Sequence, residues 1–307
     1  MPPRKQAFLP ERLLPQKMMN MDARQITNAF GLAGGMASGV MEFANDPEGT
    51  MVKRMYGGWP SQSGVVAAWL ASEGMTGPAT VLEGRQGFFR GITPNVDLGP
   101  VTPGLGQDDQ ILNTVFKPDA TCRAFHPLIE GIAELRAKHG VTSGNIEQLD
   151  IGVRESIFSY QIVYEPKSIM AAQYSMPFAT ALALSRDLAD PRSVDEACLA
   201  DATLLATASK VKAYLDPEMD AFPRYSARIK ASLRNGQVVT VTAFDHKGTP
   251  AKPFTFDEIA ARFCKMTAGI LSGQGAEKVI AAVDHLDQSN TSTLNALTTA
   301  ISPGQTL

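Results

Sequence analysis

The sequence predicts a mixed α and β fold that is mostly helical, with an all-α part built from both chain ends and an α+β domain between them. Apolar residues recur at helical spacing near both ends of the chain. Alternating apolar residues, typical of strands, occur in the middle, at 149–153 and 227–241. This order indicates a helical domain from 21–115 and 253–307, an α+β domain at 116–252, and an irregular segment at 1–20.

Composition narrows the class of protein. The 307 residues are 44% hydrophobic and 19% charged, which is typical of a globular protein with a full core. A net charge of −3 gives no basic field for nucleic acid. No apolar run approaches the ~18 residues that a membrane span needs. Three widely spaced cysteines without a CxxC motif favour a reducing compartment and disfavour a zinc site.

The first twenty residues are basic but contain no apolar stretch, so they do not form a secretory signal. We therefore expect a cytoplasmic protein, or a mitochondrial one if the source is eukaryotic.

The first ordered helix is expected to begin near Met21, where Asp22 and Gln25 resemble a capping box. Gly31, Gly34, Gly35 and Gly39 are expected to fall within this helix. Since each glycine costs about 1 kcal/mol relative to alanine in a helix, we expect close backbone approach at these positions.

The stretch 49–91 combines Lys53 with a glycine pair and a helix that we expect to start at Pro60 and end at Gly74. A lysine on a glycine-rich turn before a helix suits a carboxylate or phosphate. The alternative is a solvated basic turn before an ordinary amphipathic helix. Trp59 and Trp69 are expected in the core.

The middle of the chain contains helix and strand signals in alternation. A helix is expected to end at Gly140, and a second one spans 168–186, with Pro177 marking a kink or a restart. Ser193 and Glu196 predict a capped helix reaching to about residue 214. Asn235-Gly236 between two alternating runs predicts a β-hairpin.

The C-terminal part is expected to be helical. Thr255 and Glu258 predict a capping box for a helix that bears Ile259 and Phe263. Two further helices are expected, one over 279–286 and one over 291–300.

Three stretches, GLAGGMASGVMEFA, MVKRMYGGWPSQSGVVAAWLASEGMTGPATVLEGRQGFF and FKPDATCRAFHPLIEGI, resemble the MmgE/PrpD family over residues 22–300. That family includes 2-methylcitrate dehydratase and cis-aconitate decarboxylase. The resemblance implies a helical domain completed by the C-terminal helices, an α+β lid, and usually a homodimer. It also implies a cofactor-independent lyase that dehydrates or decarboxylates a small polycarboxylate by proton transfer next to a carboxylate.

The resemblance also implies site residues. Lys53 matches the lysine of the K-x-x-x-G motif and Lys117 the lysine that opens the lid, both as carboxylate-binding residues. Cys122 matches the last position of the K-x-x-P-x-C/H motif. A tyrosine of the next lid segment, Tyr160 or Tyr164, is expected at the reacting centre. His126 is expected to pack at a helix entry, and no metal is expected.

Two departures from the family pattern bear on function. The aromatic-proline pair after the lid lysine is replaced, with Pro118 beside Lys117 and Asp119, Ala120 and Thr121 before Cys122. This changes the pocket, so substrate identity does not transfer. The family's N-terminal helical half also has no counterpart upstream of Asp22. Two alternatives therefore stay open: a catalytically incomplete remnant or subunit pairing with a separate N-terminal half, and an isomerase or epimerase.

Overall fold

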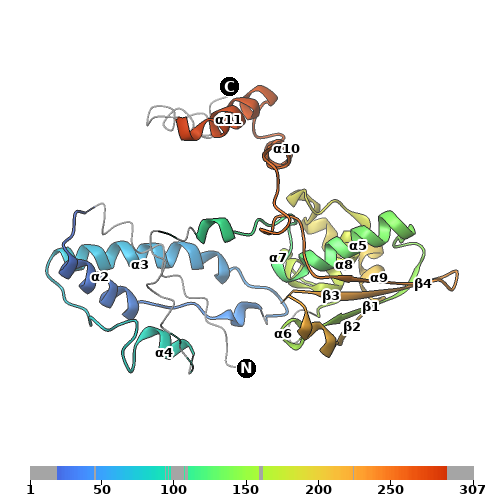
Figure 1. Ribbon diagram of the computed structural model, residues 1–307. Coiled ribbons are helices and arrows are strands. Elements are labelled where there is room, and N and C mark those ends of the chain that lie inside the picture. Colours follow the sequence, from blue (N-terminus) through green and yellow to red (C-terminus); the bar gives the residue numbers. More distant parts are fainter. Residues whose placement is uncertain are drawn as a thin grey trace. The chain divides into compact units, whose positions relative to one another are not determined.

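The structure, a computed structural model, describes residues 19–288 except 45, 94, 96, 98–106, 108–109, 159–161 and 224. The chain divides into two compact units, Met1–Asp109 and Gln110–Leu307. The predicted mixed fold, mostly helical with some β-structure, is confirmed (Figure 1). The helix expected at 291–300 lies outside the described residues. The prediction that the last helices complete the N-terminal helical domain stays a prediction.

The described part of the first unit is helical. Its two main helices, α2 (Ala23–Gly35) and α3 (Met55–Ser72), pack against each other. The Asp22–Gln25 capping box at the start of α2 is confirmed: the Gln25 backbone N–H donates to Asp22 Oδ1 at 2.7 Å. Short helices complete this unit: η2 (Met41–Ala44), η3 (Val52–Arg54) and α4 (Phe88–Ile92).

Two of the three α2 glycines lie at close backbone or side-chain approaches, as predicted. A Cβ on Gly31 would lie 2.5 Å from the Gly77 carbonyl carbon, and one on Gly34 would overlap the Val81 side chain. The prediction is wrong for Gly35, where a Cβ would meet nothing within 4 Å. It is also wrong for Gly39, which lies outside the helix with φ +115°, because α2 ends at Gly35. The chain returning after α3 therefore rests on α2 at the two positions that have no side chain.

The α3 helix begins five residues before the predicted start, which corrects the glycine-turn hypothesis. The 3-10 turn η3 runs directly into α3, so Gly57 and Gly58 are helical and Pro60 lies inside the helix. The predicted end is confirmed, because Gly74 adopts φ +95° and the Met75 N–H donates to the Leu70 carbonyl at 2.9 Å.

The prediction that both tryptophans lie in the core is wrong. Trp59 is 48% exposed and Trp69 is 58% exposed. The face of α3 that is buried carries mainly small residues, namely Pro60, Ser63, Gly64, Ala67, Ala68 and Ala71. Small side chains let α2 and α3 approach closely, and the large side chains consequently lie on the opposite face.

The second unit contains a four-stranded sheet in the order β2-β1-β3-β4. Its strands are β1 (Ile146–Val153), β2 (Val211–Leu215), β3 (Ala227–Leu233) and β4 (Val238–Ala243). Strand β1 pairs in parallel with β2 and antiparallel with β3. The predicted β3–β4 hairpin is confirmed: Gly236 has φ +85°, and the Leu233 N–H donates to the Gln237 carbonyl at 2.8 Å.

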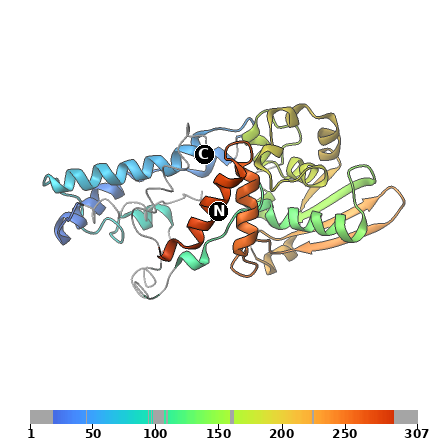
Figure 2. The ribbon, with the colours of Figure 1, turned by 90° about the horizontal axis from the view of Figure 1, so that it is seen from above.

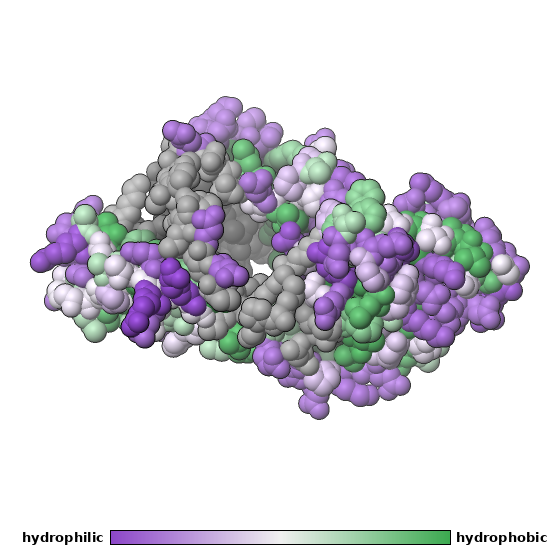
Figure 3. All heavy atoms as spheres, turned by 60° about the horizontal axis from the view of Figure 1, so that its bottom comes forward, coloured by the Kyte–Doolittle hydropathy of each residue, from purple (hydrophilic) through white to green (hydrophobic). Residues whose placement is uncertain are grey.

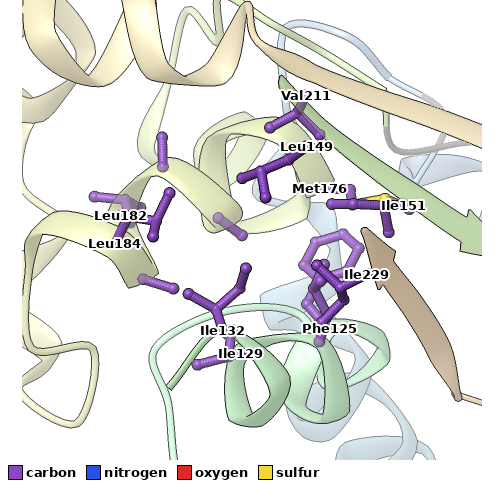
Figure 4. Packing of buried hydrophobic residues seen from close by; sticks show 14 of the residues in the cluster. Phe125, Ile129, Ile132, Leu149, Ile151, Met176, Leu182, Leu184, Val211 and Ile229 are labelled. Atoms are coloured by element: carbon purple, nitrogen blue, oxygen red, sulfur yellow. The ribbon is translucent and has the colours of Figure 1, made fainter. Parts of the chain in front are cut away.

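Helices α5 (His126–His139), α8 (Met176–Ser185) and α9 (Ala202–Ala208) form a layer on one face of this sheet (Figure 1). Residues of this layer and of the sheet share one core; those labelled in Figure 4 are Phe125, Ile129, Ile132, Leu149, Ile151, Met176, Leu182, Leu184, Val211 and Ile229. Two short helices, α6 (Glu155–Phe158) and α7 (Ile169–Tyr174), precede α8. Gly140, with φ +62°, ends α5 as predicted.

The segment expected as one helix over 193–214 instead contains two short helices and a strand. Asp195 caps the 3-10 helix η8 (Glu196–Ala200), Asp201 caps α9, and β2 follows at Val211. Each aspartate takes the backbone donors at the start of a new helix, which divides the chain into short pieces. At Pro177 the helix restarts, because the Ser175 hydroxyl caps α8 by accepting from the Phe178 N–H at 3.0 Å.

Helices α10 (Phe256–Thr267) and α11 (Gly273–Asp284) follow the sheet (Figure 2). The Thr255–Glu258 capping box of α10 is confirmed. Polar contacts hold α10 within the second unit: Arg262 donates to the Pro118 carbonyl, Lys265 pairs with Asp187, and Arg192 donates to the Lys265 carbonyl at 3.1 Å.

Hydrophilic residues occupy much of the described surface in Figure 3, with apolar residues scattered among them. Among the described residues, no helix has the length and apolar character that crossing a membrane requires.

Replacing Gly131 by alanine is expected to lower the free energy of unfolding by about 1–3 kcal/mol, the usual cost of overpacking a core. An added Cβ would overlap Ile229 Cδ1 and lie 3.1 Å from Ala243 Cβ, at the contact of α5 with the sheet. Urea unfolding measures the change. Gly144→Ala is the control, since its Cβ would meet only Thr142 Oγ1 at 3.8 Å. Equal stability of the two variants would contradict this packing.

Candidate functional site

Three segments of the second unit meet where α5 begins: the chain at 116–122, the first turns of α5, and the loop at 244–249. The Phe116 N–H donates to the Gly248 carbonyl at 2.9 Å. Gly248 adopts φ +96°, and a Cβ there would lie 2.5 Å from the Phe116 oxygen. The Lys247 N–H donates to Glu130 Oε2 at 3.2 Å, which ties the loop to α5.

The segment between Lys117 and Cys122 is fixed by its backbone. The Ala120 N–H donates to the Leu188 carbonyl at 3.1 Å, and the Cys122 N–H donates to the Gln173 carbonyl at 2.8 Å. Arg262 of α10 donates to the Pro118 carbonyl from a third direction. Consequently the side chains of this segment project from a main chain that three separate elements hold in place.

Two buried imidazoles lie directly behind this segment. His126, the first residue of α5, is 0% exposed, and His246 is 3% exposed. Their rings meet edge to face with centroids 4.9 Å apart and an interplanar angle of 85°. His246 Nδ1 lies 2.8 Å from the Lys247 carbonyl oxygen, so Nδ1 carries a proton and donates to this carbonyl.

His126 is held in its neutral form. Burial, together with the nearby His246, Lys117 and Arg123, lowers the pKa of its imidazole to about 3. Neither ring nitrogen has a hydrogen-bond partner among the described residues. The Thr121 backbone approaches the ring and opposes part of the shift, without the geometry of a hydrogen bond. His126 therefore packs at the helix entry, as the sequence predicts.

Asp119 is a half-buried carboxyl in the middle of the fixed segment. Burial, helped by the charges of Glu130 and Asp187, raises its pKa to about 6 against the opposing charges of Arg262 and Lys117. No described residue forms a hydrogen bond or an ion pair with this carboxyl group. Asp119 thus changes its protonation state near neutral pH, where most carboxyl groups stay ionised.

The structure brings Lys117 and Cys122 together on the fixed segment. Lys117 is exposed, and its positive charge acts on both Asp119 and His126. Cys122 is half-buried and packs against the core before α5. None of the three cysteines forms a disulfide.

Lys53 belongs to the first unit. It lies in the turn η3, and its Nζ is 5.6 Å from the centre of the Phe43 ring, a distance at which a cation and an aromatic face attract. Phe43 in turn meets Tyr56 edge to face at 5.7 Å. The Tyr56 hydroxyl donates to the Val40 carbonyl at 2.8 Å, which fixes this aromatic pair beneath the lysine turn.

The sequence leaves Tyr160 and Tyr164 as alternatives for the reacting centre. Tyr160 lies outside the described residues. Tyr164 is 39% exposed, and its hydroxyl donates to the Val211 carbonyl at 3.1 Å, at the start of β2. Its phenol is therefore engaged with the backbone of the sheet. A role for Tyr164 in proton transfer stays a prediction.

Sequence reasoning missed the pairing of His126 with His246 and the environment of Asp119. The two histidines lie 120 positions apart, and no local motif connects them. For Asp119 the signal was present, since a carboxylic acid stands where the family pattern has an aromatic residue. Its half-burial follows from tertiary contacts with α10 and α5, which a single sequence does not display.

Comparison with protein families gives two matches. The MmgE/PrpD N-terminal domain matches residues 16–100, and the MmgE/PrpD C-terminal domain matches residues 120–288. Lys53 lies within the first range, Cys122 and Tyr164 lie within the second, and Lys117 falls three residues before it. A search of curated proteins finds no matching relative.

Acidification is expected to destabilise the fold through His126. The pKa of His126 is about 3 in the folded state and 6.5 in the unfolded state. Between these two pH values the unfolded chain binds a proton at His126 and the folded chain does not, so acid favours the unfolded state. Stability is complete above pH ~7 and falls as the pH drops from ~6.5 towards 3, by at most on the order of 5 kcal/mol. Urea unfolding at pH 7 and pH 4.5 measures this loss.

His126→Phe keeps an aromatic ring against His246 and removes the titrating group. The variant should lose less stability than the wild type between pH 7 and 4.5. Identical losses in the two proteins would show that His126 is not held neutral by its surroundings.

Proposed function

Because the chain belongs to the MmgE/PrpD family, we propose that it is a lyase acting on a small polycarboxylate. The reaction is dehydration or decarboxylation, as for 2-methylcitrate or cis-aconitate, by proton transfer next to a carboxylate and without a cofactor. The proposed enzyme works as a homodimer.

The observation that carries this proposal is the fixed segment between Lys117 and Cys122. A substrate carboxylate is bound best by a cation whose backbone does not move, because less entropy is lost on binding. The three carbonyl contacts through Ala120, Cys122 and Arg262 provide such a backbone. His126 behind the segment is held neutral, and the exposed Lys117 and Arg123 are positive charges at the two ends of the segment.

The chemistry follows from the charge that develops in the reaction. Removing a proton or CO₂ beside a carboxylate gives a carbanion-like state, and a fixed ammonium group stabilises the enolate-type charge on that carboxylate. Lys117 and Lys53 are proposed for this role as point charges. Cys122 and one of Tyr160 and Tyr164 are the proposed groups near the proton that moves.

One observation favours a second candidate function, a catalytically incomplete family member that binds another protein through helix α3. Met55, Trp59, Val65 and Trp69 lie on the outer face of α3 and are each about half exposed or more. The buried apolar residues of this unit are few and mostly small: Met21, Ala29, Ala68 and Ala71 form one cluster, and Ala33, Phe43, Ala44 and Ala67 are also buried. An apolar helix face of this size is typical of a surface that binds another protein.

Lys117→Ala is expected to reduce kcat/KM about 10²–10³-fold, because it removes a contact to charge that develops in the transition state. The assay offers citrate, 2-methylcitrate and cis-aconitate to the purified chain and follows alkene absorbance and CO₂ release. Lys53→Ala should give a loss of similar size. Lys138→Ala is the control, since Lys138 pairs with Glu134 on the exposed side of α5 at 2.9 Å.

Turnover that survives in both Lys117→Ala and Lys53→Ala would contradict the roles of these lysines. A folded wild-type chain that turns over none of the three compounds would favour the second candidate function, and co-purification of a partner would then test it.

A further inference from the structure

We propose that Glu130 is a positioning residue for Lys117: by holding the loop at 246–252, it keeps in place the backbone that carries this substrate-binding lysine. The inference rests on the proposed function, in which Lys117 binds a carboxylate of the substrate. It gives a role in ligand binding to a side chain of α5 that takes no part in the proposed proton transfer or in the proposed carboxylate contacts.

The backbone of Lys117 is anchored on both sides. The Phe116 N–H, one residue before Lys117, donates to the Gly248 carbonyl at 2.9 Å. The Pro118 carbonyl, one residue after it, accepts a hydrogen bond from Arg262 of α10. The Lys117 side chain is exposed. Its ammonium group therefore extends from a backbone whose position depends on the loop and on α10.

The loop lies closely against Phe116. Gly248 has φ +96°, a conformation that favours glycine, and a Cβ there would lie 2.5 Å from the Phe116 carbonyl oxygen and 2.8 Å from Phe254 Cε2. Two backbone hydrogen bonds close the loop on itself. The Gly248 N–H donates to the Lys252 carbonyl at 2.8 Å, and the Lys252 N–H donates to the Thr249 carbonyl at 3.1 Å. A displacement of the loop is therefore passed on to Phe116.

Glu130 contacts this loop with both carboxylate oxygens. Its Oε2 accepts from the Lys247 N–H at 3.2 Å, and its Oε1 lies 3.7 Å from Lys252 Nζ. The Lys247 side chain extends to α10, where its Nζ lies 2.8 Å from Glu258 Oε2. The loop is thus attached to α10 through the side chain of Lys247, and to α5, which packs on the sheet, through Glu130.

Loss of the Glu130 carboxylate should reach the ligand through Lys117. The Lys247 N–H loses its acceptor, so the loop and Phe116 are held less firmly. The ammonium group of Lys117 then samples more positions, and its contact with a carboxylate weakens because more entropy is lost on binding. Small displacements matter, since misplacing a group at a site by about 1 Å can cost about 100-fold in activity.

Glu134 provides a matched control one turn further along α5. The side chains of Glu130 and Glu134 are both 42% exposed, and each lies beside a lysine. Glu134 pairs with Lys138 of the same helix at 2.9 Å, whereas Glu130 reaches the loop. The same substitution at the two positions therefore separates the loop contact from a general effect of removing a carboxylate from α5.

The test measures the Kd of propane-1,2,3-tricarboxylate, an unreactive polycarboxylate, by calorimetry at pH 7.5. Lys117→Ala should weaken binding about tenfold or more, the effect of one lost contact to a charged group. Glu130→Ala should weaken it about threefold to tenfold, as expected for residues that are coupled. Glu130→Gln keeps an oxygen that accepts from the Lys247 N–H. It should stay within about twofold of the wild type, because the half-exposed pair with Lys252 contributes little. Glu134→Ala should leave the Kd unchanged.

The double variant Lys117→Ala/Glu130→Ala adds a readout that a purely structural role would not move. If Glu130 acts through Lys117, adding Glu130→Ala to Lys117→Ala should leave the Kd unchanged. Urea unfolding shows whether each variant folds. Glu130→Met, which keeps the length of the side chain without its oxygen atoms, replaces Glu130→Ala if that variant does not fold.

Equal weakening by Glu130→Ala in the presence and absence of Lys117 would overturn the inference and leave the proposed function in place. An unchanged Kd in Glu130→Ala, or an equal loss in Glu130→Gln or Glu134→Ala, would overturn it as well. An unchanged Kd in Lys117→Ala, or a folded wild type that does not bind the ligand, would contradict the proposed function and the inference with it.

Discussion

The close packing of α5 on the sheet is the constraint on which the rest of the second unit depends. Gly131 lets the helix approach β3 and β4, and the face of α5 that carries Leu128, Ile132 and Leu135 is buried there. This contact fixes the start of α5, and thereby the position of His126 and of the segment before it. Glu130, one turn further, then holds the loop after β4 through the Lys247 backbone.

Around Lys117, burial determines the protonation states of His126 and Asp119 more than ion pairing does. His126 stays neutral because it is buried beside other basic groups, so it adds no cation behind the segment. Asp119 is partly desolvated and loses its proton only near pH 6. Lys117 is left as an exposed ammonium group between a neutral imidazole and a carboxyl of intermediate acidity.

The sequence correctly predicted helix ends and a hairpin that depend on hydrogen bonds between residues close together in the chain. The capping boxes at Asp22 and Thr255, the Gly140 helix end and the Asn235-Gly236 hairpin are each set by hydrogen bonds within a few residues, and all four are confirmed.

The sequence predictions were wrong where tertiary contacts or competing helix N-caps determine the structure. The 193–214 segment is divided by Asp195 and Asp201, whose caps compete with one long helix. Trp59 and Trp69 follow a helical stripe, but α2 packs on the small-residue face instead. The sequence was sufficient to propose Lys117 and Cys122 as residues of the candidate site. The contacts that hold it, from Gln173, Leu188 and Arg262, join residues distant in the chain, which a single sequence does not reveal.

The most direct test of the account is a crystal structure of the chain with a bound polycarboxylate, solved at neutral pH. The account predicts that a ligand carboxylate lies within hydrogen-bond distance of Lys117 Nζ, in front of the fixed segment and outside the buried His126–His246 pair. A ligand bound elsewhere, out of reach of Lys117, would contradict it.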